Sequence, residues 1–196
     1  ELHETSQILF QQMKELGEPV EQLTIGIVNE TENVVEVFAT VLGSQLQQSF
    51  RHSIDEPTVM NKMYRGWKAQ QKSLLLEMNS DDIQVYNRDR NELVKSEMFS
   101  TTLSKDDRRI LYAAYFSKGM LVLGSNTPLS EESHRLLERF AGVFDGTYTR
   151  FLDLQKAEAQ VREAQIEASL ERVRSRTMAM QRSGELTETV KLLFEE

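Results

Sequence analysis

The chain has 196 residues, of which 39% are hydrophobic and 28% are charged, and its formal net charge at pH 7 is −8. A chain of this length normally holds one domain or two. Its acidic balance, without a stripe of Lys and Arg between aromatic residues, argues against a nucleic-acid-binding surface. The absence of cysteine excludes disulfides, thiolate metal sites and thiol catalysis within these residues. No apolar run is long enough to span a membrane, so we expect no membrane insertion in this segment. The lack of cysteine fits a reducing compartment, and we expect a cytoplasmic protein.

The first half of the sequence predicts a helix, a β-hairpin and a second helix. Leu2, Leu9 and Leu16 recur every seven residues, as in an amphipathic helix. The runs LTIGIVN and VVEVFATVL carry β-branched residues on both sides of a polar turn, which indicates two antiparallel strands. The expected elements are a helix over 2–16, strands over 23–29 and 34–42, a loop over 43–56 and a helix over 57–71.

The second half predicts two helices around a further set of strands. Ser80 is a candidate N-cap, followed by two acidic residues that favour the first turn of a helix. Ser117 to Gly119 form a hairpin turn signal between two apolar runs. Ser130 is a second candidate cap, and no proline follows it. The expected elements are a strand over 72–78, a helix over 80–99, a hairpin over 109–125 and a helix from 130 to about 182.

This order of elements predicts an α+β fold, because hairpins place strands in antiparallel pairs and helices must then cover the sheet. We expect one antiparallel sheet of five to six strands, flanked by helices, with a long C-terminal helix. The expected organisation is a domain over 1–155, a linker helix over 156–184 and a further segment over 185–196.

The last twelve residues repeat the first twelve. The stretches ELHETSQILFQQ (1–12) and ELTETVKLLFEE (185–196) share Glu, Leu, Glu, Thr, Leu and Phe at matching positions. Long-period similarity of this kind is typical of arrays of units. We therefore expect residues 185–196 to begin a second copy of the unit that starts at residue 1.

Two apolar heptad patterns follow one another along the linker helix, offset by two residues. Their side chains predict the interface of a parallel homodimeric coiled coil, with a register break that can support two packings. The expected interface residues are Leu154, Val161 and Ala168 from the first pattern and Leu170, Val173 and Thr177 from the second.

Residues 2–155 resemble the GAF family of small-molecule sensor domains. The resemblance rests on the element order and on GMLVLGSNTPLSEESHRLLERFAGVF (119–144), where a strand leads through a capped turn into an amphipathic helix. A PAS-like or other sensor fold is the alternative. The stretch ASLERVRSRTMAMQRSGEL (168–186) resembles linkers of multi-domain sensor histidine kinases. These resemblances imply a sensory input domain, without enzymatic activity, that controls an output domain in the same parent chain.

The resemblance also implies where a small-molecule ligand would lie, over the sheet and beneath the helices and loops after the second and third strands. By that analogy the pocket residues would be Phe38, Tyr64, Trp67, Tyr86 and Tyr112, although aromatic residues at such positions also serve as plain core. Asn61 and Lys62 begin, but do not continue, the signature of cyclic-nucleotide-binding members. No residue stands out as an axial haem ligand, so the sequence assigns no cofactor.

No catalytic or metal-binding motif is present. His3, His52 and His134 have no metal-binding partner at helical spacing, and we interpret them as surface side chains. The pairs Asp81–Asp82 and Asp106–Asp107 fall at expected element starts, where carboxylates cap helices or face solvent.

Two further hypotheses for the function of the chain remain. One is a ligand-free dimerisation and spacer module. The other is a kinase dimerisation fragment in which His134 accepts phosphate, although Arg135 stands where an acidic residue is expected.

Overall fold

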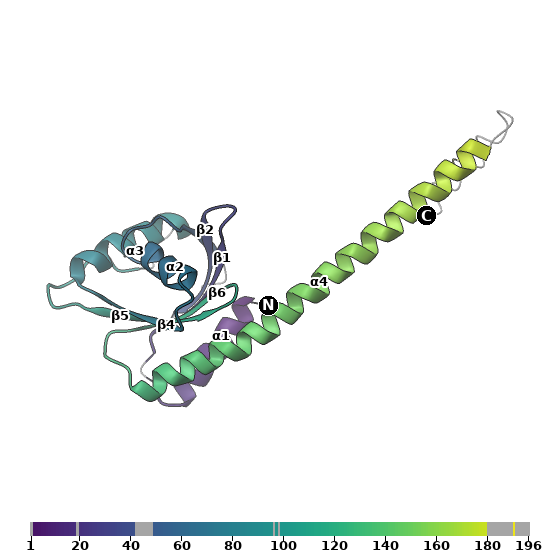
Figure 1. The fold of residues 1–196 in the computed structure, drawn as a ribbon. Coiled ribbons are helices and arrows are strands. Elements are labelled where there is room, and N and C mark those ends of the chain that lie inside the picture. The colour runs from purple at the N-terminus through teal and green to yellow at the C-terminus, as the bar shows by residue number, and fades with distance from the viewer. Residues whose placement is uncertain are drawn as a thin grey trace. The chain divides into compact units, whose positions relative to one another are not determined.

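The structure is a computed structural model that describes residues 2–18, 20–41, 49–95, 97, 99–179 and 190. Its described residues form a six-stranded antiparallel sheet and four helices, which confirms the predicted α+β class (Figure 1). The strand order is β3-β2-β1-β6-β5-β4. The elements are α1 (Leu2–Glu15), β1 (Gln22–Asn29), β2 (Val34–Val41), β3 (Phe50–Ser53), α2 (Met60–Lys68), β4 (Ser73–Met78), α3 (Ser80–Val94), β5 (Arg109–Phe116), β6 (Gly119–Ser125) and α4 (Glu131–Ala179).

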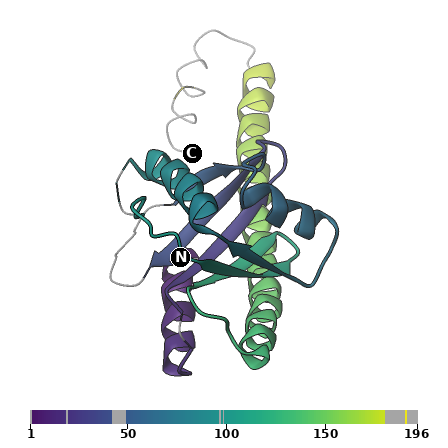
Figure 2. The same cartoon turned by 90° about the vertical axis from the view of Figure 1, so that its left-hand side faces the viewer.

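The two faces of the sheet are covered by different helices. Helices α2 and α3 lie over one face, and α1 lies over the other, where it packs on β1 and β2 (Figures 1 and 2). Strand β2 alternates in burial as a two-sided strand must: Val35, Val37 and Ala39 belong to the core beneath α2 and α3, together with Met63 of α2 and Tyr86 of α3. We call this side of the sheet the α3 face.

The segment expected to be a loop over 43–56 contains a strand, so that expectation was wrong in part. Strand β3 pairs with β2, and Val35 lies opposite His52 in the ladder. Phe50 and His52 are buried and alternate with exposed Arg51 and Ser53. A four-residue strand with only one strongly apolar side chain gives a weak sequence signal, which explains the error. Residues 42–48 lie outside the described part of the chain.

Helix α3 begins at Ser80, as expected, but its cap is a different residue and it ends earlier than expected. Its N-cap is Asn79 rather than Ser80, because the Asn79 side chain accepts a hydrogen bond from the Asp82 amide at 2.9 Å. Its last residue is Val94 rather than 99, and Lys95 ends it in the left-handed conformation with φ of 51°. The chain then returns along the helix, held by two hydrogen bonds between Asn91 and Phe99. This return places the Phe99 ring against the guanidinium of Arg90 on α3.

Helix α2 is also shorter than the expected span of 57–71. Its N-terminal amides are held by the side chain of Glu56, four residues before Met60, and not by a residue at the capping position itself. Pro57 therefore lies in the turn that precedes the helix. The hairpin of β5 and β6 and the Ser130 cap of α4 follow the sequence expectation, since the Ser133 amide donates to Ser130 Oγ at 3.1 Å.

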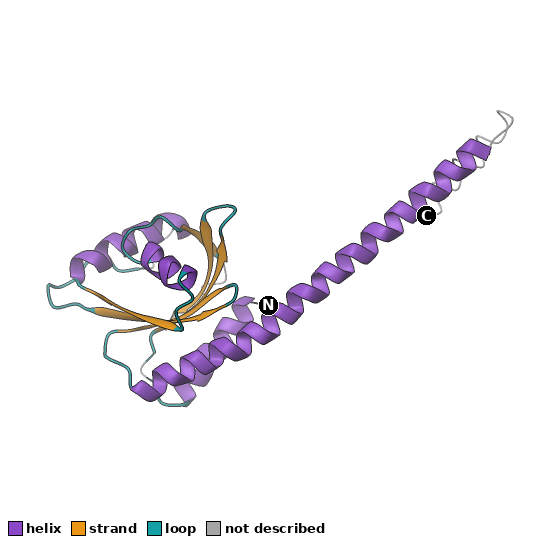
Figure 3. Cartoon of the chain, viewed as in Figure 1, coloured by secondary structure: helices purple, strands orange, loops and turns teal. Residues whose placement is uncertain are grey.

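Helix α4 is continuous over 49 residues and is on the order of 70 Å long at 1.5 Å per residue (Figure 3). The chain divides into two compact units, Glu1–Asp145 and Gly146–Glu196. The expected second repeat at 185–196 lies outside the described residues, apart from Val190.

Candidate functional site: a buried polar row beneath helix α3

A row of polar and charged side chains crosses the largely apolar α3 face. They come from four different elements and one turn, so the fold and not a local motif brings them together. In spatial order they are Glu56, His52, Tyr86, Arg90, Gln22 and Arg109. We call them the buried polar row.

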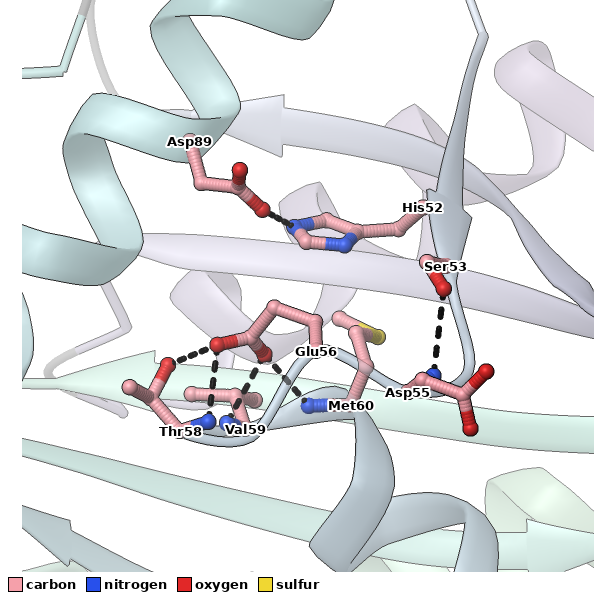
Figure 4. A network of polar contacts seen from close by, with 8 residues as sticks. All are labelled: His52, Ser53, Asp55, Glu56, Thr58, Val59, Met60 and Asp89. Carbon is pink, nitrogen blue, oxygen red and sulfur yellow. Dashed lines mark hydrogen bonds and ion pairs between the residues drawn. The ribbon is translucent and has the colours of Figure 1, made fainter.

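Glu56 is 8% exposed and anchors one end of the row at the start of α2 (Figure 4). Its carboxylate accepts hydrogen bonds from the amides of Thr58, Val59 and Met60 at 2.7, 2.9 and 2.8 Å, and from the Thr58 hydroxyl. Burial alone would raise the pKa of Glu56, but these hydrogen bonds outweigh it and lower the pKa. Glu56 is therefore a fixed negative charge that is committed to the protein backbone.

His52 is fully buried, which overturns its interpretation as a surface side chain. Its ring stacks on Tyr86 at 5.7 Å between centroids, and neither ring nitrogen has a hydrogen-bond partner. Asp89 Oδ2 lies 3.5 Å from Nε2, beyond a good hydrogen bond (Figure 4). Burial lowers the pKa of His52 and outweighs the opposite effect of Asp89 and Glu56. The folded protein thus holds a neutral imidazole with free polar atoms.

Arg90 is the largest fully buried side chain, at 1% exposure. Its guanidinium lies 3.4 Å from the ring centroid of Phe99 and 5.0 Å from that of Tyr86, two cation–π contacts in one site. Its Nη2 donates to Gln22 Oε1 at 3.3 Å, and its Nε has no acceptor. Two aromatic faces and one amide oxygen therefore replace the water that a guanidinium normally binds.

Arg109 reaches the same amide oxygen from β5. Its Nη2 donates to Gln22 Oε1 at 2.9 Å, while its Nε, like that of Arg90, has no acceptor. Gly124 makes room for it, since a Cβ at this position would lie 2.7 Å from Arg109 Nη2. We call Arg90 and Arg109 the arginine pair. Their two cations meet at one neutral oxygen.

No carboxylate lies within ion-pair distance of the arginine pair among the described residues. Burial is the main cause that lowers the pKa of Arg90 to about 10, and the positive charge of Arg109 adds to it. Burial also lowers the pKa of Arg109, against a smaller opposite effect of Glu21. A buried charge is costly unless it is paired. The arginine pair is therefore an uncompensated positive centre beneath α3.

A cavity of about 590 Å³ adjoins this centre. Its volume lies within the range of small-molecule sites in proteins. Gln22, Asn87 and Phe99 are buried and form its inner wall, and Arg109 is half-buried beside them, whereas Asp106 and Arg108 are exposed. The buried polar row thus ends at a space that opens to solvent.

The structure does not bring the five predicted pocket residues together. Tyr86 belongs to the buried polar row. In α2, Tyr64 donates to Glu30 at 2.6 Å and Trp67 donates to the Phe116 carbonyl at 3.0 Å. Phe38 alternates with buried Val37 and Ala39 of β2 and so lies on the opposite face of the sheet.

Tyr112 also lies on the opposite face, between core residues Leu111 and Ala113 of the α3 face. Its hydroxyl accepts a hydrogen bond from the Leu129 amide at 2.8 Å, and its ring centroid is 4.3 Å from that of His134. Because His134 is half-buried and its Nε2 is buried without a partner, it is not the free surface side chain that we expected. The His3 side chain lies outside the described part.

Asp81 and Asp82 lie in the first turn of α3, as expected. Asp106 and Asp107 lie instead in the turn that precedes β5, where Asp107 accepts a hydrogen bond from the Ser104 amide at 2.7 Å. Within the described part of the chain, no group of three or more His, Asp or Glu side chains is placed to hold a metal ion.

The expected dimer-interface residues lie on α4 with most of their surface open in the single chain. Leu154, Val161 and Leu170 are 59%, 58% and 60% exposed, and Ala168 is exposed as well. Val173 is half-buried, and its carbonyl accepts a hydrogen bond from the Thr177 hydroxyl at 2.9 Å.

Sequence reasoning missed Gln22, Glu56, Arg90 and Arg109, and it misplaced His52. Each stands alone in its segment, at a spacing that matches no motif. One signal was available. Tyr86 and Arg90 are four residues apart and therefore lie on the same face of α3. In a half-buried helix, the face that carries Tyr86 is the one that packs on the core. A charged residue on that face is a candidate for a function.

None of the helices among the described residues is both long and apolar enough to cross a membrane. No protein-family model matches this chain, and no curated protein is detectably similar to it.

Proposed function

We propose that the compact unit Glu1–Asp145 is a sensory input domain that binds a small molecule on its α3 face, without catalysing a reaction. Its signal passes along α4, paired with the same helix of a second copy, to an output domain in a larger cytoplasmic signal-transduction protein. The proposal joins the resemblance to GAF domains and sensor-kinase linkers with the contents of the α3 face. Neither the arginine pair nor His52 has the arrangement of a hydrolytic or redox centre.

The observation that carries this proposal is the uncompensated arginine pair beside a cavity. A core built only for stability gains nothing from a buried and a half-buried guanidinium group that share one amide oxygen, because apolar side chains of similar volume cost less. Stability is given up at functional sites when binding requires it. A bound molecule would supply the missing contacts.

The proposed relay along α4 rests on the solvent-exposed apolar residues of this helix. Leu154 and Val161 are seven residues apart, and both expose more than half of their surface. We call Leu154 and Val161 the α4 stripe. A long, polar helix with such exposed apolar residues is stabilised when it pairs with another helix. A parallel pair would connect two sensor domains to two output domains.

A ligand-free dimerisation and spacer module is the second candidate, since the same α4 stripe favours it equally. The two candidates differ only in whether the α3 face is occupied. The kinase-fragment hypothesis needs a reachable His134, and the burial of its Nε2 against Tyr112 gives that hypothesis no support. A His134→Gln variant that kept all phosphotransfer in the parent protein would remove it.

Native mass spectrometry of the chain beside a version that ends at Leu154 tests the proposal. We expect a dimer that becomes a monomer on truncation, and a small added mass that both versions retain. A dimer without added mass after purification from several hosts would favour the spacer module. Cysteine crosslinking at Ala164 and Leu170 then tests the relay, because one unchanged pattern with and without ligand contradicts it.

A further inference from the structure

We propose that the arginine pair binds an anionic oxygen group, a carboxylate or a phosphate, of a small ligand whose body fills the adjoining cavity. The inference rests on the proposed small-molecule-binding function and names the chemical class of its ligand.

The donor set fits an oxyanion. Guanidinium groups present planar N–H donors that match carboxylate and phosphate oxygens. Arg109 lines the cavity, and Arg90 lies directly behind Gln22 and Phe99, two of the lining residues. Both arginines have an Nε without an acceptor. An anion that binds in the cavity beside Arg109 would bring a negative charge close to both guanidinium groups.

The fixed carboxylates nearby do not fill this role. Glu21 accepts a hydrogen bond from Asn126 at 2.7 Å and makes no ion pair with Arg109. Asp107 is held by the Ser104 amide, and Glu56 by the start of α2. Asp89 lies at the other end of the row, beside His52. Each of these carboxylates has another partner, so the positive centre is left for a ligand.

The cavity also limits what the rest of the ligand can be. Buried Phe99 and Ile83, with half-buried Leu103, offer an apolar wall, which suits an apolar ligand body. Exposed Asp106 and Arg108 and half-buried Asp107 line the cavity as well, and their opposite charges offset one another in part. We therefore infer a compact ligand whose anionic end meets the arginine pair.

The test uses the full chain, with sodium phosphate and sodium acetate as probes and sodium chloride at equal ionic strength as the reference. Binding is followed by NMR through the side-chain Nε–Hε signals of the arginines. We expect saturable shifts of two arginine signals with phosphate, with acetate or with both. A response to one probe alone tells a phosphate-bearing ligand from a carboxylate. Shifts with neither probe, or equal shifts with chloride, would overturn the inference.

Three variants locate the site. Arg109→Gln should weaken probe binding at least about tenfold, because it removes a charge-assisted hydrogen bond. Gly124→Ala keeps both charges but displaces the Arg109 guanidinium, and it should weaken binding as well. Arg88→Met, at an exposed position of α3, is the matched control and should bind as the original chain does. Unchanged binding by Arg109→Gln would refute the site.

Arg90→Met separates a binding role from a structural one. If the arginine pair exists for a ligand, removing one buried charge should leave the melting temperature without probe equal or higher, while probe binding is lost. If Arg90 only supports the fold, the melting temperature should fall, and the inference is then wrong. Failure of this variant to fold counts as the second result.

The inference and the proposed function can fail separately. A neutral molecule that is retained in native mass spectra, equally by Arg109→Gln, would overturn the anion site and leave the sensory function standing. Probe binding that depends on Arg109 but never changes the α4 crosslinks would support the anion site and contradict the relay.

Discussion

Glu56 acts as a remote cap for α2. Its carboxylate holds three consecutive backbone amides, Thr58, Val59 and Met60, that have no partner within the helix. In a Glu56→Gln variant, one carboxylate oxygen becomes an amide that cannot accept. We expect the free energy of unfolding to fall by about 2–3 kcal/mol, since hydrogen bonds to a buried charge are worth more than neutral ones. Urea unfolding followed by circular dichroism measures it.

Glu92→Gln provides the matched control for this change. Glu92 lies on α3 and is exposed, so the same substitution there should alter the unfolding free energy by less than about 0.5 kcal/mol. Equal effects of both variants would mean that the Glu56 carboxylate contributes no more than a surface charge does.

His52 should make the stability of the fold depend on pH. Burial, the largest cause, lowers the pKa of His52 below its ordinary value of 6.5, and Arg90 acts in the same direction. Asp89, Glu56 and the backbone of Ser53 oppose this shift. Below pH 6.5 the unfolded chain therefore binds a proton that the folded chain does not. We expect stability to be fully present above that pH and to fall as the pH decreases toward the folded pKa.

An NMR titration of the His52 ring checks this directly. The midpoint in the folded protein should lie below the midpoint of the same chain in urea. A His52→Gln variant should show a flatter dependence of unfolding free energy on pH below 6.5. A folded midpoint above the unfolded one would reverse the sign and would make the contact with Asp89 the dominant interaction.

At the scale of elements, the α4 stripe should decide whether two copies of the chain form a dimer. Leu154→Lys together with Val161→Lys places charges at two expected seam positions of each helix. Burying one such apolar side chain is worth about 1.5–3 kcal/mol, so we expect the dimer dissociation constant to rise more than about a hundredfold. Sedimentation velocity over a range of concentrations measures it.

The matched control is Gln155→Lys with Ala159→Lys, which adds the same charge on the same helix outside the expected seam. Both positions are exposed. This variant should associate as the original chain does. If the two double variants behave alike, net charge and not the stripe controls association.

The sequence predicted elements wherever a side-chain period repeats, and it failed where a contact at long range decides. The hairpin of β5 and β6 follows from two apolar runs around a turn. Strand β3 does not, because it has four residues and its position is set by pairing with β2. The end of α3 depends on Asn91 binding the returning chain at Phe99.

The candidate site was even less predictable. It depends on Gln22, which is 68 residues from Arg90 and 87 from Arg109 in the sequence. A single sequence gives no signal that joins three such positions. The aromatic residues that were expected to line one pocket divide between the two faces, because strand alternation alone does not tell which face holds a ligand.

At the scale of the whole molecule, the two compact units should differ in how their stability depends on concentration. The buried core belongs to Glu1–Asp145, where six strands and four helical segments contribute to it. Residues 146–179 belong to one helix, on which Leu154, Val161 and Leu170 are exposed. A helix without a packing partner is marginal in water. Hydrogen exchange in residues 155–179 should therefore slow as protein concentration rises, whereas exchange in the sheet should not change.

The version that ends at Leu154 shows whether the sheet is stable without residues 155–179. It should keep the cooperative unfolding transition of the sheet with a similar midpoint, because the truncation removes only exposed helix. Its exchange rates in β1 and β6 should match those of the full chain at every concentration. Slow exchange in 155–179 of the full chain at the lowest concentration would contradict pairing as the source of order. The helix would then be stable alone, and a relay by repacking of two helices would lose its physical basis.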